Sequence, residues 1–402
     1  MNKIVNIIKN NVNNTIWRYY AFTFLKDLSF FSAVLVPFFT EWGHISLFQV
    51  QILQSWFMFW FFILEIPTGA VADYIGRKHS MALGALVVAI AAIVYGSVPR
   101  FEIFLLGEFL FAAAMSFVSG ADEALLYDSL KEAGREGERK KIFGRANSFH
   151  LLGMFIAAPI GSFVASRFGL NVPILISSGS FFLAALVAWS IKEPLIHQAK
   201  SESRRYLDIV RTGFSFLRNH KILKLLALDA IVVASSSYFV IWLYQPLLRS
   251  VGIGIFYLGI VHAALILSEI IISTNFERLI KLFGSDKRYL RVSTIIVILS
   301  FLLVAAWPNI ITISILIILG GGFGLTRLPL MSSYMNRFIP SEQRATILSS
   351  ISMFRRFGLV ILNPLIGFTA DHSLRLAALI VGLLPLVLFI FSPIEQKMLE
   401  DN

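Results

Sequence analysis

Long apolar segments recur along the whole chain, and they constrain its fold more than any other feature. A helix that crosses the hydrocarbon core of a bilayer needs about 20 mostly apolar residues. Such segments occur twelve times, at residues 17–39, 47–70, 80–98, 101–126, 146–167, 172–191, 222–248, 254–275, 292–307, 310–335, 346–369 and 374–392. Hydrophobic residues make up 57% of the 402, more than a soluble chain of this length carries. The sequence therefore predicts an all-α integral membrane protein with twelve transmembrane helices.

The longest polar segment, Lys192 to Lys221, divides six spans from six. We predict an N-terminal six-helix half at residues 1–192, a cytoplasmic linker at 193–221 and a C-terminal six-helix half at 222–402. Arg145-Ala146 and Arg344-Ala345 each open the fifth span of a half, which favours two pseudo-symmetric bundles with a cavity between them. Helical spacing of apolar residues in the linker predicts an interfacial amphipathic helix, through Leu207, Val210, Phe214 and Leu217.

Basic residues fall unevenly on the two sides of the predicted spans. If the N-terminus is cytoplasmic, the outer segments carry only Arg100, Arg167, Arg249 and Arg375. Because cytoplasmic loops are the ones enriched in Lys and Arg, both termini are predicted to be cytoplasmic. The bases lie in short runs between apolar segments, so we expect the +11 net charge to meet anionic membrane lipids and not nucleic acid.

The chain lacks the residues that several classes of protein function need. The chain has no cysteine, hence no disulfide and no thiol-ligated metal. It also has no ATP-binding loop, cluster of metal ligands or nucleophile elbow. We therefore predict that the protein is not an enzyme and holds no metal or cofactor.

One turn between two spans carries a specific motif. Residues 65–78 read Glu-Ile-Pro-Thr-Gly-Ala-Val-Ala-Asp-Tyr-Ile-Gly-Arg-Lys, an apolar segment that ends in an acid followed by paired bases. Glycines permit close helix approach and unusual backbone angles there. The turn resembles the loop between helices 2 and 3 of the major facilitator superfamily, whose pattern is roughly Gly-x-x-x-Asp-x-x-Gly-Arg-Lys. The residues that match are Gly69, Asp73, Gly76, Arg77 and Lys78.

This resemblance, to bacterial multidrug and metabolite exporters in particular, implies a transporter that works by alternating access. It also implies a cytoplasmic gate of salt bridges around the turn. Acids near the turn stand opposite several bases; the gate candidates are Glu65, Gly69, Asp73, Gly76, Arg77, Lys78, Asp122, Glu123, Asp128 and Arg145. Ordinary surface pairing, at about 0 to 1 kcal/mol for each pair, is the alternative.

Eight ionisable residues lie well inside the predicted spans, at Lys26, Asp27, Glu108, Asp229, Glu269, Arg327, Arg355 and Arg356. If all faced lipid, at roughly 2.5 to 3.5 kcal/mol each, they would cost more than the typical stability of about 5 to 15 kcal/mol. They are expected to face each other or water. Spans 3, 6, 9 and 12 contain none of them, and the resemblance makes those four spans the lipid-facing periphery.

Individual roles for these residues follow less directly from the pattern. Asp27 is our first candidate for a carboxylate that carries a proton, and a fixed ion pair with Arg355 or Arg356 is the alternative. Lys26 should point about 100° away from Asp27 around a regular helix. His262 and Glu269 lie seven residues apart on one helix face, which suits either a proton relay or an ordinary hydrogen bond for the histidine. Arg327, which follows three glycines, is a candidate for substrate or gating contacts.

Aromatic residues gather on spans 2 and 7. They could stack on an amphipathic or cationic substrate, or simply pack between helices. The candidates for the substrate cavity are Trp56, Trp60, Tyr238, Trp242, Tyr244, Gln245 and His262. Two details depart from the resemblance: span 4 offers Glu108 where many family members carry an arginine, and span 5 has Ala158-Pro159 in place of Gly-Pro.

These features together predict a secondary active transporter, coupled to protons, that exports a small amphipathic compound. Uptake of a nutrient or metabolite by the same fold is the first alternative. A receptor or scaffold that does not transport is the second, and it should tolerate Asp27→Asn and Arg327→Ala. We expect a monomer in the plasma (inner) membrane of a bacterium, with a small-molecule substrate, protons and membrane lipids as partners.

Overall fold

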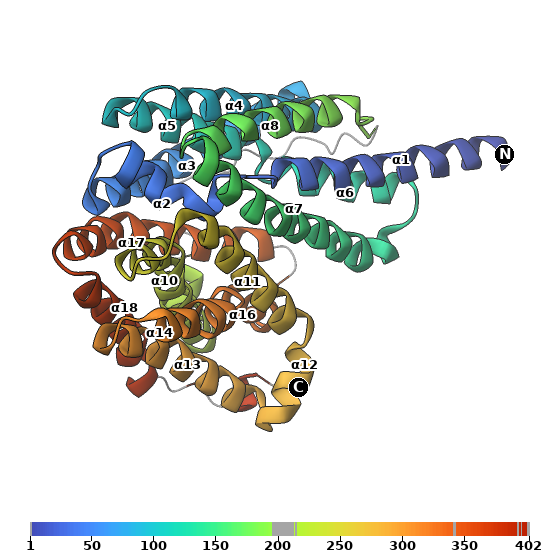
Figure 1. Cartoon of the computed structure of the whole chain (residues 1–402). Helices are drawn as coiled ribbons and strands as arrows, with labels where there is room; N and C mark the ends of the chain where they lie inside the picture. Colours follow the sequence, from blue (N-terminus) through green and yellow to red (C-terminus); the bar gives the residue numbers. More distant parts are fainter. Residues whose placement is uncertain are drawn as a thin grey trace. The chain divides into compact units, whose positions relative to one another are not determined.

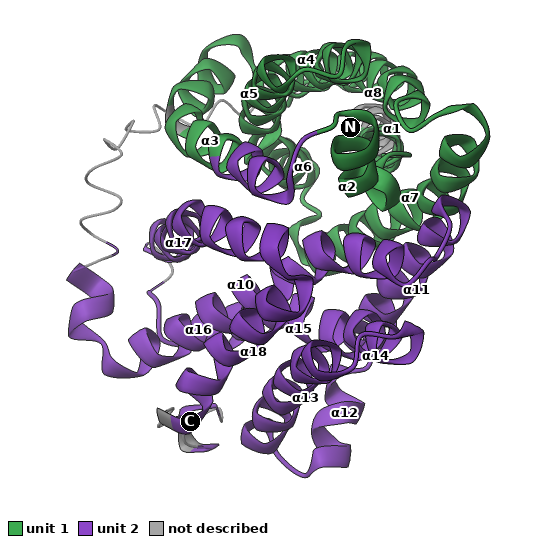
Figure 2. Cartoon of the chain, turned by 60° about the vertical axis from the view of Figure 1, so that its left-hand side comes forward, with its two compact units in different colours: residues 1–44, 56–203 green, residues 45–55, 204–402 purple. Residues whose placement is uncertain are grey.

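A computed structural model describes residues 2–194, 213, 215–340, 343–391, 394 and 396–399 of the chain. Within these residues the secondary structure is helical and includes no β-strand (Figure 1). The chain separates into two compact units: Met1–His44 with Trp56–Ser203, and Ile45–Ser55 with Arg204–Asn402 (Figure 2). The helix α3 contributes its first residues to the second unit and the others to the first.

The first unit begins with a helix that stops inside the predicted first span. Short helical turns continue that span, and longer helices follow. Its elements are α1 (Asn2–Lys26), η1 (Ser32–Val34), α2 (Leu35–Pro37), η2 (Phe38–Trp42), α3 (Leu47–Ile75), α4 (Arg77–Ser97), α5 (Phe101–Val118), α6 (Ala121–Glu132), η3 (Glu136–Glu138), α7 (Arg139–Phe168) and α8 (Val172–Ser190).

The second unit contains one span that is built from several short helical pieces, which together cover Ile310–Met335. Its elements are α10 (Lys221–Ser250), α11 (Ile255–Thr274), α12 (Phe276–Phe283), α13 (Asp286–Ala306), α14 (Ile310–Ile315), η4 (Leu316–Gly321), α15 (Gly322–Leu325), α16 (Arg327–Met335), α17 (Arg344–His372), α18 (Leu374–Phe391) and η5 (Gln396–Met398).

The predicted fold class is confirmed. Ten helical stretches of the described chain are long and apolar enough to cross a membrane. A shorter apolar helix, Leu374–Ile390, occupies the place of predicted span 12. Predicted span 1 differs from expectation, because its helix ends at Lys26 and the chain is irregular until Ser32. The other predicted spans correspond to the ten stretches.

Helix packing in the first unit depends on small side chains. The helix α4 packs against α5 and α8, and most of its buried residues are small, namely Ser80, Ala82, Gly84, Ala85, Ala89, Ala91, Ala92 and Gly96. Its exposed residues include the large apolar Leu83, Leu86, Ile90 and Ile93. Small residues let helix backbones approach closely where lipid supplies no hydrophobic driving force. The division of small and large residues therefore separates protein-facing from lipid-facing surface.

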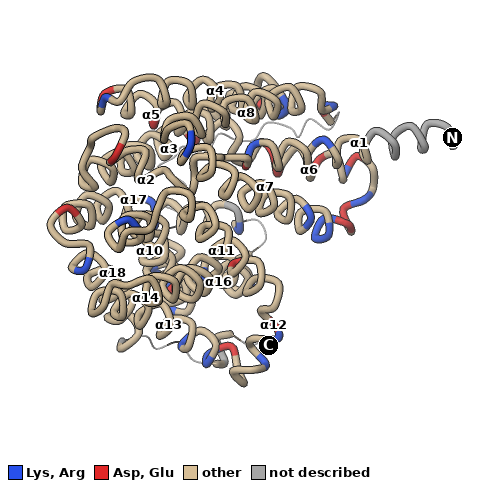
Figure 3. The backbone as a smooth tube through the Cα atoms, viewed as in Figure 1, with Lys and Arg blue, Asp and Glu red and all other residues tan. Residues whose placement is uncertain are grey.

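The predicted linker helix, with Leu207, Val210 and Phe214, lies outside the described residues, which omit 195–212 and 214. The domain boundaries at 192 and 222 accordingly stay a prediction. Figure 3 shows that charged residues are sparse along most of the helices and gather near helix ends, for example around the turn between α12 and α13. That distribution is the one expected of helices that span a bilayer.

Candidate functional site

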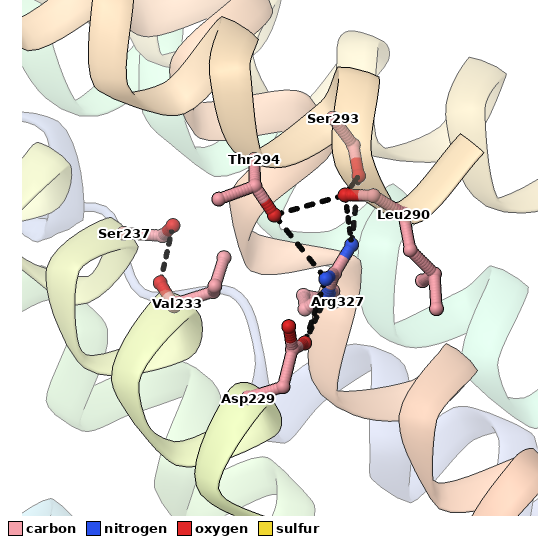
Figure 4. A network of polar contacts seen from close by, with 7 residues as sticks. All are labelled: Asp229, Val233, Ser237, Leu290, Ser293, Thr294 and Arg327. Atoms are coloured by element: carbon pink, nitrogen blue, oxygen red, sulfur yellow. Dashed lines mark hydrogen bonds and ion pairs between the residues drawn. The ribbon is translucent and has the colours of Figure 1, made fainter. Parts of the chain in front are cut away.

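Arg327 is a deeply buried charged group of the second unit and is only 2% exposed. Its Nε and Nη2 donate to Oδ1 of Asp229 at 2.8 and 2.6 Å (Figure 4). Nη1 donates to Ser293 Oγ at 2.7 Å and to the carbonyl oxygen of Leu290 at 3.0 Å, and Nη2 also reaches Thr294 Oγ1 at 3.2 Å. All five N–H donors of the guanidinium are thus used. The structure brings together two residues that the sequence could propose only separately.

Glycines position the helix that carries Arg327. A Cβ atom on Gly321 would overlap the side chain of Leu265, and one on Gly322 would lie 2.7 Å from Ser268 Oγ. Gly324 is packed against Ser237 in the same way. The glycine run therefore permits close packing on α10 and α11, as its composition suggested. A π-helical turn, η4, precedes Arg327, and such turns are frequent at functional sites.

Asp229 retains an unused oxygen beside a small cavity. Both bonds from Arg327 end on Oδ1, and Oδ2 accepts no hydrogen bond from the described residues. The cavity measures about 30 Å³, enough for water, and Lys287 and Arg291 also line it. Asp229 is 6% exposed and is ion-paired through Oδ1. Water could therefore reach its carboxylate only from the side that faces the cavity.

Asp27 in the first unit lies directly after the end of α1, and its side chain is 14% exposed. Nδ1 of His150, on α7, is 2.7 Å from Oδ2, and Nζ of Lys26 is 3.3 Å from Oδ1. The expectation that Lys26 points away from Asp27 was wrong, because the regular helix ends between the two residues. Lys26 is thus an ion-pair partner of Asp27, and the imidazole of His150 contacts its other carboxylate oxygen. The alternative pairing of Asp27 with Arg355 or Arg356 stays a prediction.

Tertiary contacts stabilise the break in the first span. The backbone N–H of Phe30 donates to Ser177 Oγ at 3.0 Å, and Ser180 Oγ donates to the carbonyl oxygen of Leu28 at 3.1 Å. A Cβ atom on Gly161 would overlap the carbonyl oxygen of Phe30, so α7 also approaches the irregular backbone closely. Irregular backbone at membrane depth persists only where protein or water satisfies it. The helices α7 and α8 do so here.

The motif turn is fixed by two acids of the first unit. Gly76 has φ +96°, a conformation that favours glycine, as predicted. Nη1 of Arg77 contacts Oδ2 of Asp128, which is 2% exposed. The Glu193 carboxylate accepts from the backbone N–H groups of Arg77 at 2.7 Å and Lys78 at 2.9 Å, and so caps the start of α4. Three segments that are distant in the sequence meet at this turn.

The other gate candidates lie at different places in the first unit. Gly69 was expected at a close helix approach, yet a Cβ atom there would meet nothing within 4 Å among the described residues. Asp73 is exposed in the last turn of α3, and Glu65 lies two turns earlier. Asp122 accepts from the N–H of Glu123 at 2.8 Å.

Two further contacts complete the account of the gate candidates. The ammonium group of Lys26 acts electrostatically on Asp122, which ties that acid to the surroundings of Asp27. Arg145 is exposed on α7, where its charge acts on Tyr20. Among the gate candidates, Arg77 and Asp128 thus form an ion pair, and Glu193 holds the backbone of Arg77.

Two of the remaining ionisable candidates, Glu108 and His262, have hydrogen-bond partners that the sequence did not predict. Glu108 is 6% exposed and accepts from the hydroxyl of Tyr95 at 2.6 Å. His262 is bonded through Nδ1 to the Tyr244 hydroxyl at 2.8 Å, and its Nε2 has no hydrogen-bond partner in the described chain. The relay between His262 and Glu269 is therefore not formed. Arg355 and Arg356 are half-buried on α17.

Most of the aromatic candidates pack between helices. Trp56 donates to the carbonyl oxygen of Leu105 at 3.0 Å, and Trp60 stacks edge-on against Phe109 with ring centroids 4.9 Å apart. On α10, Trp242 is 6% exposed and Gln245 1%, while Tyr238 meets Trp242 at 6.1 Å. These contacts agree with the packing alternative for Trp56 and Trp60.

Sequence reasoning missed two residues of these sites, His150 and Glu193. His150 lies within predicted span 5, so its position as an ionisable group inside a span was an available signal. Glu193 follows predicted span 6 directly, and an isolated acid there has no distinguishing pattern. Its capping role depends on the tertiary approach of two helix ends.

Comparison with known proteins gives several similarities. The chain is 23% identical over 212 residues to D-xylose-proton symporter-like 3, chloroplastic, of Arabidopsis thaliana, a match that covers 50% of this chain and 37% of that protein. It is 26% identical over 131 residues to the L-fucose-proton symporter of Escherichia coli strain K12, covering 32% of this chain and 29% of the symporter. The matches thus span less than half the length of these relatives.

Solved structures resemble the fold over nearly the whole chain. The nucleoside transporter NupG superposes with a TM-score of 0.77 at 16% identity, covering 97% of this chain and 100% of NupG. A bacterial homolog of the human lysosomal transporter Spinster, in an inward-facing and occupied conformation, superposes with a TM-score of 0.74 at 14% identity, covering 97% and 98%. The sequence model of the Major Facilitator Superfamily matches residues 20–361, so the chain belongs to that superfamily of membrane transporters.

Proposed function

We propose that this chain is a proton-coupled secondary transporter that moves a small compound by alternating access. The observation that carries the proposal is the contact of Asp27 with His150, at 2.7 Å, beside a broken membrane span. A carboxylate and an imidazole within hydrogen-bond distance can each accept and release a proton near neutral pH when their surroundings are suitable. Ionisable groups inside a membrane span generally mark ion or proton pathways.

Protonation at this site would be transmitted to the helices around it. Asp27 carries the negative charge that faces both Lys26 and His150, so adding a proton removes both attractions together. The irregular backbone that follows is bonded to Ser177 on α8 and packed on Gly161 of α7. A change at Asp27 therefore acts on three helices of the first unit. Such a local charge change can bias a two-state element of a transporter.

A proton that moves down the membrane potential would supply enough free energy to concentrate a substrate. One elementary charge that crosses a potential of 100 mV supplies about 2.3 kcal/mol. For a neutral substrate that moves with one proton, this corresponds to a gradient of roughly 40-fold. No ATP-binding element is required.

The test uses the full chain in liposomes that contain a pH-sensitive dye. Candidate compounds, namely D-xylose, L-fucose, a nucleoside and a set of amphipathic amines, are added outside without an initial pH gradient. We expect one class to change the internal pH through the wild type and not through Asp27→Asn. The matched control is Glu102→Gln, which removes an exposed acid of the same unit and should keep the response. Substrate movement without proton flux through the wild type would overturn the coupling.

The sign of the pH change decides the direction of coupling. A compound that enters with protons acidifies the interior, whichever way the protein is inserted, and one that enters in exchange for protons makes it alkaline. Export by antiport remains our proposal from the sequence. Symport is the second candidate, because two relatives in the comparison are named proton symporters of sugars.

We propose Trp242 and His262 as the first substrate contacts to test. Both residues are at least nine-tenths buried, and Nε1 of Trp242 and Nε2 of His262 have no hydrogen-bond partner among the described residues. Unpaired buried polar atoms are costly, so a polar group of a substrate would satisfy them. Trp242→Phe and His262→Phe should raise KM for the compound and leave the proton dependence unchanged.

The pair Arg77 and Asp128 is proposed as the cytoplasmic gate, with both chain termini on the same side of a bacterial plasma membrane. Glu193 supports the gate, because its carboxylate holds the backbone from which Arg77 projects. The side assignment depends on the excess of Lys and Arg in the segments that share that side.

A further inference from the structure

Two cations of α13 project to a cavity that the proton site does not use. Lys287 and Arg291 lie one turn apart and line the cavity of about 30 Å³ together with Asp229 and Arg327. The apolar lining comes mainly from Leu388 and Phe389 on α18 and from Ile394. Charged residues concentrate at this end of α13 (Figure 3).

Among the described residues that line this cavity, the charges are not balanced. Asp229 is the acid among the lining residues, and its charge is opposed by Arg327, whose N–H donors are all occupied. Lys287 and Arg291 form no ion pair or side-chain hydrogen bond with the part of the chain that the structure describes. The three cations and one acid leave two positive charges, on the two residues with free donors. An anion would neutralise them.

The nearby acid Asp286 does not serve as that anion. Its carboxylate accepts from the Tyr334 hydroxyl and from Nε2 of Gln396. The same Gln396 accepts through Oε1 from the backbone N–H of Lys287 at 2.9 Å, which fixes the start of α13. The backbone beneath the cations is therefore held in place while their side-chain donors remain free.

The walls of the cavity indicate what kind of anion fits. Leu388 and Phe389 belong to α18, and the family resemblance implies that both α18 and α13 lie at the lipid-facing periphery. Basic pockets between membrane helices on the cytoplasmic side commonly bind anionic headgroups. A soluble phosphate would satisfy the cations and leave the apolar wall uncovered. A lipid would cover both.

We propose that Lys287 and Arg291, which line the cavity between α13 and α18, bind the phosphate group of an anionic phospholipid. Lys287 and Arg291 donate to the phosphate oxygens, and Leu388 and Phe389 contact the lipid next to its headgroup. The site is separate from Asp27 and does not depend on which compound the protein transports. Asp229 borders it, so an occupied site places a negative charge near that carboxylate.

The test is native mass spectrometry of the full chain after purification with phosphatidylglycerol or phosphatidylcholine. We expect one phosphatidylglycerol to remain bound to the wild type under conditions that remove phosphatidylcholine. The double variant Lys287→Gln/Arg291→Gln should bind phosphatidylglycerol roughly 30-fold more weakly, at about 5-fold for each charge. The matched control is Arg288→Gln. It removes one positive charge from the same helical turn, but Arg288 does not line the cavity, so this variant should bind the lipid as the wild type does.

Each result decides for or against the site. Equal retention of phosphatidylglycerol by the double variant, or equal loss in Arg288→Gln, would show unspecific surface attraction and overturn the proposal. Competition by inorganic phosphate at millimolar concentration, with no preference between the two lipids, would assign the cavity to a soluble anion and overturn the lipid source. The charge-conserving Lys287→Arg should retain the lipid, which separates loss of binding from loss of folding.

Discussion

The ion pair of Asp229 and Arg327 allows a quantitative test of how the second unit is held together. In Asp229→Asn the amide keeps an oxygen near Nε and Nη2, so the shape is conserved and the charge is lost. The guanidinium then remains buried, at 2% exposure, without a counter-charge. Removal of one partner of a buried pair typically costs about 3 to 5 kcal/mol. Arg327→Met should cost near the lower end of that range, because Asp229 borders a polar cavity and can take up water or a proton.

The double variant Asp229→Asn/Arg327→Met leaves no unpaired charge. We expect its loss of stability to be smaller than the sum of the single losses by about 3 kcal/mol, measured by equilibrium unfolding in mixed micelles with denaturant. Single losses that add within about 0.5 kcal/mol would refute the reasoning, since they would show that the two charges do not depend on each other. Transport by the double variant then separates two roles. A pair that only supports the fold allows transport to recover with stability, whereas a pair that takes part in coupling does not.

Two other predictions follow from the first unit. Gly161→Ala should destabilise the protein by about 1 to 3 kcal/mol, because the added methyl group would overlap the carbonyl oxygen of Phe30, while Gly144→Ala, with nothing near its Cβ, should be neutral or slightly stabilising. The unfolding midpoints of both variants check this, and equal midpoints would contradict the close packing. Asp128→Asn should reduce transport by leaving the partly buried Arg77 without its acid, and the reversed pair Arg77→Asp/Asp128→Arg should restore at least half of the rate. If the reversed pair folds and does not transport, the electrostatic attraction between the two side chains is not sufficient for transport.

The class of fold was predictable from the sequence because length and apolarity of the spans are local properties. Span boundaries, small-residue packing and the glycine at position 76 also follow from local composition. The pairing of charges was not predictable. Asp229 and Arg327 are 98 positions apart. The four acids and four bases inside the predicted spans could form many different sets of ion pairs, and each set would keep the same charges away from lipid. Only the approach of α10, α13 and α16 selects one of them.

The break after Lys26 had no signal in the sequence either. No glycine or proline lies between Asp27 and Phe31, and the segment is apolar enough to continue as a helix. The irregular backbone is stabilised from outside, by the hydroxyl groups of α8 and by Gly161 on α7. Tertiary contacts thus override local propensity at the place where we propose the proton site. Such conflicts between local preference and structure are expected at functional sites.

The two acids Asp27 and Asp229 belong to the first predicted span of their respective halves, yet their partners differ in a way that bears on coupling. The partner of Asp229 is a guanidinium, which is a permanent positive charge in proteins. The Asp27 carboxylate instead contacts the imidazole of His150, and an imidazole is a side chain that can exist with or without a charge. A proton carrier must change its charge during each cycle, and a structural pair must not. This difference supports our proposal that the first unit moves the proton and that the Asp229–Arg327 pair of the second is a fixed electrostatic support. Asp27→Asn and the Asp229/Arg327 double variant test the two parts separately.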